Sequence, residues 1–142
     1  MSSSISHAER RLFQLVVFIA APVPIAAGAG GVWKGPHLAG GVPAFNVDLD
    51  SHFRYLSGLL LGIGLAFMFC AARIERRGLL LRTLGLIVVA GGLGRLYGAS
   101  LSGLPGAGQR FGLVMELLVV PALLLWHYRI EDRHRREDLR EF

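Results

Sequence analysis

Four long runs of this 142-residue chain are almost free of charged residues, and this feature constrains the fold more than any other. The runs span about residues 11–32, 53–72, 79–101 and 111–128, and each is close to the ~20 residues that a helix needs to cross the hydrocarbon core of a bilayer. A backbone inside a bilayer must satisfy its own hydrogen bonds, which a helix does within one segment. The sequence therefore predicts an all-α, polytopic membrane protein with a bundle of four transmembrane helices.

The basic residues lie at the ends of these runs, so the net charge of +5 indicates topology and predicts no nucleic-acid partner. Arginines precede the first run, surround the connection between the second and third runs, and follow the last run. In the other two connections, the only lysine or arginine residues are Lys34 and Arg110. The positive-inside rule then predicts that both termini are cytoplasmic.

Residues 1–128 are predicted to form a single membrane domain, and residues 129–142 a charged, helical cytoplasmic tail. In the tail, Glu131 and Arg135 are four residues apart, as are Asp132 and Arg136, a spacing that suits ion pairs on a helix. The basic start and small-residue end of the first run also resemble a cleaved signal peptide. Because prolines at 22 and 24 interrupt its apolar region, we expect a retained helix that is kinked there.

Besides Arg11 and Arg82, which belong to the basic residues around the run ends, three charged residues lie inside the apolar runs: Arg54, Arg95 and Glu116. A charge near the bilayer centre costs roughly 2.5 to 3.5 kcal/mol on insertion scales, so each needs a partner, water or a nearby interface. Arg95 is near the outer end of the third run and Glu116 near the outer start of the fourth, at matching depth, which predicts that they pair. Asp50 is four residues before Arg54 and is predicted to contact it in the same way.

These charges are predicted to form one polar cluster that opens outward. Tyr55 and Ser100 lie close to the same level in the sequence and are expected to add hydrogen bonds to the cluster. The single cysteine, Cys70, excludes an internal disulfide, and no spacing typical of a metal site or of a catalytic motif is present. We therefore assign no catalytic residue, no metal and no cofactor.

Glycines accompany both arginines at helical spacing. Gly91, Gly94 and Gly98 share a face with Arg95, and Gly58 and Gly62 follow Arg54 at steps of four. Small residues at such spacing let membrane helices pack closely. The same faces could instead leave room for the head group of a ligand that the arginines hold, and the sequence leaves both interpretations open.

The order and spacing of six residues resemble a known family. They are Asp50, Arg54, Tyr55, Gly58, Arg95 and Glu116. The chain resembles the small bacterial membrane proteins of the domain-of-unknown-function 4345 family from Leu12 to Tyr128, and its fold is more distantly similar to DoxX-like four-helix proteins. The resemblance implies a four-helix protein of the bacterial inner membrane, but it implies no activity.

The leading functional hypothesis is that the Arg/Glu cluster binds a small amphiphile, lipid or quinone-like, among the membrane lipids. The first alternative is an accessory or structural subunit whose glycine faces and tail dock on a membrane protein partner or on a second copy. The second alternative is an isomerase-like membrane enzyme that uses Glu116.

Overall fold

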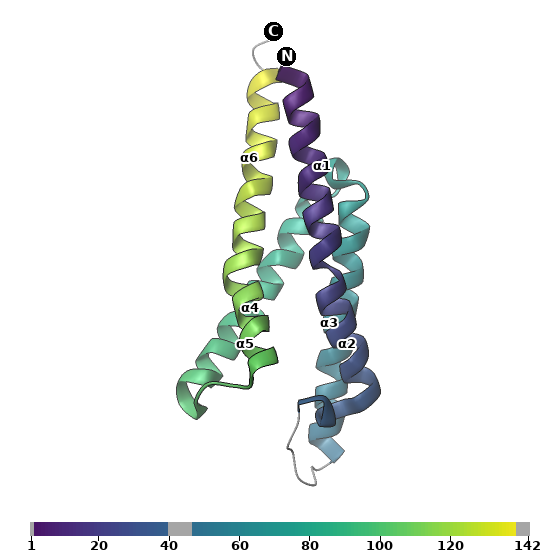
Figure 1. Ribbon diagram of the computed structural model, residues 1–142, viewed down its shortest axis with the longest axis vertical. Coiled ribbons are helices and arrows are strands. Elements are labelled where there is room, and N and C mark those ends of the chain that lie inside the picture. Colours follow the sequence, from purple (N-terminus) through teal and green to yellow (C-terminus); the bar gives the residue numbers. More distant parts are fainter. Residues whose placement is uncertain (1, 40–46, 139–142) are drawn as a thin grey trace. The chain divides into compact units, whose positions relative to one another are not determined.

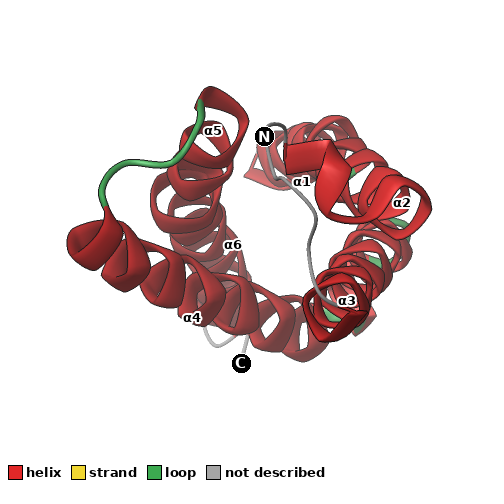
Figure 2. Cartoon of the chain, turned by 90° about the horizontal axis from the view of Figure 1, so that it is seen from below, coloured by secondary structure: helices red, strands yellow, loops and turns green. Residues whose placement is uncertain are grey.

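The computed structural model describes residues 2–39 and 47–138, and this part of the chain contains only helices and connecting loops (Figure 2). In chain order the elements are α1 (Ser2–Ala20), α2 (Pro22–Lys34), a 3₁₀ helix (Gly35–Ala39), α3 (Val47–Ala71), a second 3₁₀ helix (Ile74–Arg76), α4 (Gly78–Ser102), α5 (Ala107–Val114), a π-helical segment (Met115–Val119) and α6 (Val120–Asp138) (Figure 1). The predicted all-α fold class is confirmed.

Four helical stretches are long and apolar enough to cross a membrane: Ala8–Leu38, Val47–Ala71, Gly78–Ser102 and Ala107–Arg133. Each overlaps one of the predicted runs. The shortest have 25 residues, which at about 1.5 Å per residue exceeds the ~30 Å thickness of the hydrocarbon core. Only 6 to 22% of the residues in their most apolar windows are buried, so most of their apolar side chains are free to face lipid.

The chain packs as two compact units. Residues 14–73 form the first, here called the α2–α3 unit. The residues up to Phe13 and those from Ile74 onward form the second, here called the α4–α6 unit. Helix α1 therefore contributes its first part to one unit and its last part to the other. The predicted domain of residues 1–128, with a tail from 129, stays a prediction.

In the α2–α3 unit, two antiparallel helices approach so closely that glycine is required at the contacts. A Cβ atom at Gly28 would lie 2.5 Å from the backbone nitrogen of Leu61, and one at Gly31 would overlap Ser57. A Cβ at Gly64 would lie 2.7 Å from Ile25. The glycines therefore let each helix lie directly against the backbone or the side chains of the other, as small residues permit in membrane helices.

The first span is interrupted where the sequence predicts a kink. Helix α1 ends at Ala20 and α2 begins at Pro22. Pro22 and Pro24 have no N–H to donate to the preceding turn, whereas the amide of Ile25 again bonds to the carbonyl of Ala21, at 3.3 Å. Before this interruption, the side-chain amide of Gln14 in α1 donates to the carbonyl of Ala71 at 3.0 Å and so caps the end of α3.

In the α4–α6 unit, a small core forms near the chain ends. Phe13, Leu81, His127 and Ile130 are all at most 6% exposed. The ring of Phe13 meets that of Trp126 edge to face, with centroids 5.2 Å apart.

Hydrogen bonds and ion pairs of charged residues join α1 and α4 to α6 at the same end of the unit. Glu9 accepts a hydrogen bond from the indole of Trp126 and pairs with Arg133, each at 3.2 Å. Arg82 pairs with Glu131 at 2.8 Å. Packing therefore continues past residue 128. The predicted pairs of Glu131 with Arg135 and of Asp132 with Arg136 involve side chains outside the described part of the chain.

Candidate functional site

Arg95 on α4 and Glu116 in the π-helical segment form a two-pronged ion pair. Arg95 Nε donates to Glu116 Oε2 at 3.0 Å, and Nη2 donates to Oε1 at 2.9 Å. The side chains are 33% and 14% exposed, respectively. Paired, nearly parallel bonds of this kind fix the orientation of a guanidinium as well as stabilising its charge. The pairing predicted from matching depth is confirmed.

Gln109 supplies a third contact that the sequence analysis missed. The Nη1 group of Arg95 donates to Gln109 Oε1. Gln109 lies in α5, directly after the loop that follows α4, and residues 109, 112 and 116 share one helix face by their steps of three and seven. We call Arg95, Gln109 and Glu116 the Arg95 cluster.

The helix that carries Glu116 changes geometry at this point. The amide of Val120 bonds to the carbonyl of Met115, five residues earlier, so the turn is wider than an α-helical one. Pro121 follows, and its ring would collide with the carbonyl of Leu117 in a regular α-helix. The π turn relieves this conflict, and the Arg95 cluster is built directly on it.

Two glycines bring the backbones close enough for the pair to form. A Cβ at Gly92, one turn before Arg95, would lie 2.8 Å from Glu116 Cβ and 2.9 Å from a methyl carbon of Leu117. A Cβ at Gly112 would lie 3.9 Å from the guanidinium of Arg95 and from Glu116 Oε1. Gly92 thus sets the approach of α4, whereas a Cβ at Gly112 would make only ordinary contacts with the charged groups.

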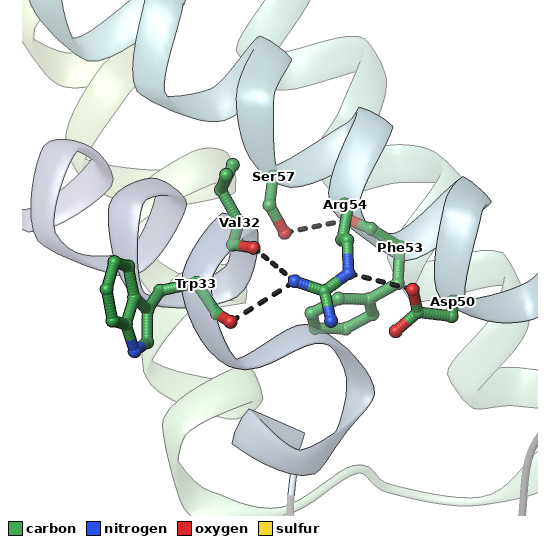
Figure 3. Close-up of polar contacts among 6 residues, drawn as sticks. All are labelled: Val32, Trp33, Asp50, Phe53, Arg54 and Ser57. Atoms are coloured by element: carbon green, nitrogen blue, oxygen red, sulfur yellow. Dashed lines mark hydrogen bonds and ion pairs between the residues drawn. The ribbon is translucent and has the colours of Figure 1, made fainter.

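Arg54 lies in a different setting, at the end of α2 (Figure 3). Its Nε donates to Asp50 Oδ2 at 2.8 Å, as the spacing of four predicts. Its Nη1 donates to the carbonyls of Val32 at 2.5 Å and Trp33 at 3.1 Å. Helix α2 ends at Lys34, so these are two of the last carbonyls, which have no partner within the helix. Arg54 therefore caps the C-terminus of α2.

The chain turns next to this cap at Gly35, whose φ is +60°. A Cβ there would lie 2.6 Å from Asp50 Oδ1 and 2.8 Å from Arg54 Nη2. Both the backbone conformation and the space require glycine. The charge of Arg54 is thus accounted for inside the α2–α3 unit by one carboxylate and one helix end.

Residues 12–127 match a protein family described as a domain of unknown function, DUF4345. The chain belongs to the DUF4345 family. The resemblance stated from the sequence is confirmed, and the match includes both arginines and all members of the Arg95 cluster. Comparison with curated proteins and with solved structures finds no match.

The other polar residues predicted for the site of this DUF4345 chain lie apart from its ion pairs. Tyr55 is 63% exposed. The hydroxyl of Ser100 donates to the carbonyl of Tyr97 on its own helix, at 2.7 Å. The described contacts of Arg54 lie in the α2–α3 unit and those of Arg95 in the α4–α6 unit, so one shared cluster stays a prediction.

The glycines at which helices approach closely are not the ones for which the sequence predicted helix packing. Among the described residues, a Cβ at Gly62, Gly91, Gly94 or Gly98 would meet no atom within 4 Å, and one at Gly58 would only touch Val32, at 3.9 Å. The glycine of α4 that faces Glu116 is Gly92. A packing role for the open glycines therefore concerns a partner outside the described contacts, and it stays a prediction.

Within the described part of this DUF4345 chain, no group of three or more His, Cys, Asp or Glu side chains could hold a metal ion. The Arg95 cluster offers one carboxylate, an amide and a guanidinium, which suit hydrogen bonding. Chemically, this arrangement can offer N–H donors to a bound molecule, beside exposed apolar side chains.

Proposed function

We propose that this chain is a multi-pass protein of the bacterial inner membrane, with both termini cytoplasmic, that binds a small amphiphile at the Arg95 cluster on the outward side. The amphiphile is a lipid or a quinone-like molecule. Its head group contacts Arg95 and Gln109, and its chain lies along the apolar faces of α4 and α5.

The observation that carries the proposal is the partly exposed guanidinium of Arg95. An arginine has five N–H donors, and the contacts to Glu116 and Gln109 occupy three of them. One third of the side chain is exposed, so the other donors can reach an acceptor on a bound molecule. A hydrogen bond to such an acceptor is stronger in an apolar membrane, where water does not compete for the donor.

Apolar side chains near the cluster support the same proposal. Leu96, next to Arg95, is 45% exposed, and Phe111 and Val114 on α5 are 54% and 48% exposed. Polar donors beside uncovered apolar surface match the two ends of an amphiphile. Arg54 is left out of the proposed site because it serves as the cap of α2.

The proposal is tested by native mass spectrometry of the full chain, extracted in a mild detergent. We expect one amphiphile to remain on each chain and to be lost in Arg95→Gln, while circular dichroism shows an unchanged helix content. The matched control Arg110→Gln removes an exposed arginine from the same helix as Gln109 and should keep the molecule. A bare wild-type chain, or equal retention by Arg95→Gln, would overturn the proposal.

The second candidate, an accessory or structural subunit, is favoured by the open glycine surface of α4. Gly91, Gly94 and Gly98 would let another helix approach to backbone contact. Crosslinking in native membranes should then trap one partner, and Gly94→Leu should abolish the crosslink. If only the chain itself is recovered, a second copy is the partner; recovery of no crosslinked species rejects the subunit role.

The isomerase-like alternative depends on Glu116 as a proton donor. Both of its carboxylate oxygens already accept hydrogen bonds from Arg95, so both are engaged within the cluster. This arrangement weighs against an acid role for Glu116.

A further inference from the structure

We infer that the head group held at the Arg95 cluster is a neutral hydrogen-bond acceptor, such as the carbonyl of a quinone or an ester, and is not an anion. This inference rests on the proposed amphiphile-binding function and names the chemical class of the ligand. Two properties of the cluster lead to it: the kind of atoms left facing outward, and the charge already balanced inside.

The atoms that remain available at the exposed side of the cluster are donors. An arginine has no acceptor, so the amide of Gln109 must turn its oxygen toward Arg95 Nη1. The amide nitrogen of Gln109, with two N–H groups, is then directed away from Arg95. Gln109 is exposed and Glu116 is largely covered, so an approaching molecule meets N–H groups of Gln109 and Arg95 first.

The charge of the guanidinium is already neutralised by Glu116. A second carboxylate or a phosphate at the same guanidinium would face Glu116 at short range, and like charges close together in an apolar environment repel strongly. A neutral carbonyl takes the same hydrogen bonds without that cost. The next arginine, Arg110, is exposed, and the described hydrogen bonds of Arg95 do not include it.

Gly112 places no side chain beside the pair. The nearest atoms to a Cβ at Gly112 would be Arg95 Cζ and Nη1 and Glu116 Oε1, each at 3.9 Å. Because position 112 carries no side chain, the edge of a carbonyl-bearing head group can approach the pair from this side while it accepts from Arg95 and Gln109. A side chain at position 112 would occupy the same place.

The test compares two probes with matched apolar tails: decylubiquinone, which is neutral, and decanoate, which is anionic. Each is titrated into the purified full chain in detergent, and the bound fraction is read by native mass spectrometry. We expect decylubiquinone to bind about tenfold more tightly than decanoate. Gln109→Met keeps the side-chain size but removes the amide, and should weaken decylubiquinone binding about three- to tenfold.

Control variants separate the possible failures. Arg110→Gln should leave decylubiquinone binding unchanged, and Gln109→Met should keep a cooperative melting transition close to that of the wild type, because only one exposed hydrogen bond, to Arg95, is lost. Tighter binding of decanoate that Gln109→Met weakens would overturn the neutral class but leave the proposed function standing. Binding of neither probe would overturn both. Binding of decylubiquinone that Gln109→Met does not change would overturn the assigned contacts.

Discussion

At the scale of single residues, the charges inside the apolar runs each have a local partner. Arg95 meets a carboxylate and an amide, and Arg54 meets a carboxylate and a helix end. The Arg95–Glu116 pair could be predicted because residue counting gives depth in a membrane helix. The helix cap could not, because it depends on where α2 ends.

Gln109 was missed for a related reason. A glutamine close to a loop usually indicates a solvated surface, and no charge demanded a partner there. Its spacing of three and seven from Gly112 and Glu116 was the signal that could have found it.

Reversing the charges tests the Arg95–Glu116 pair. Arg95→Glu and Glu116→Arg should each lower the free energy of unfolding by about 1 to 3 kcal/mol, because each leaves two like charges facing each other. The double reversal should recover part of that loss. Thermal unfolding in one detergent measures all four proteins, and simple additivity of the two single changes would reject the pairing.

Gly35→Ala tests the turn beside the Arg54 cap. The φ of +60° and the contact of 2.6 Å with Asp50 Oδ1 should make this change cost about 1 to 3 kcal/mol. Gly58→Ala is the matched control in the same unit, since its Cβ would make only an ordinary contact at 3.9 Å. Equal melting temperatures for the two variants would contradict the described turn.

At the scale of elements, glycines spaced by seven position α4 against α6 and the π-helical segment. A Cβ at Gly78 would overlap Glu131, one at Gly85 would lie 2.6 Å from Leu124, and one at Gly92 would lie 2.8 Å from Glu116. The sequence shows many glycines on α4, and periodicity alone does not tell which face meets the partner helix. Likewise no disturbance of the last span was predicted from Pro121, and the π turn before it depends on the neighbouring contacts.

Neighbouring glycines of α4 provide a controlled comparison. Gly92→Ala should lower the melting temperature, with a cost of about 1 to 3 kcal/mol, because the added methyl group collides with Glu116 and Leu117. Gly91→Ala meets open space and should be neutral or stabilise the helix by up to about 1 kcal/mol. The reverse order of stabilities would show that α4 presents a different face.

At the scale of the whole molecule, four apolar helices were predictable because each run is long, nearly free of charged residues, and bounded by arginines or by glycine- and proline-rich connections. The division into two units was not, since it depends on which helix pairs share close glycine contacts. Hydropathy depends on the length and composition of each helix, whereas packing depends on which face of a helix contacts its neighbour.

The proposed topology makes a separate prediction. Arginines gather at both chain ends and at the connection between α3 and α4, so both termini are expected to be cytoplasmic. A green fluorescent protein fused to either terminus should therefore fluoresce, and an alkaline phosphatase fused there should be inactive. Alkaline phosphatase and green fluorescent protein fusions measure the two sides. A terminus with phosphatase activity would contradict the predicted orientation.

The central claim is that the Arg95 cluster holds the head of a small amphiphile. An experimental structure of the full chain in lipid nanodiscs tests it most directly. The account predicts density for a head group within hydrogen-bond distance of Arg95 and Gln109, next to Gly112, with a tail along α4 or α5. A cluster covered by a neighbouring helix, or bordered only by solvent and mobile lipid, would contradict it.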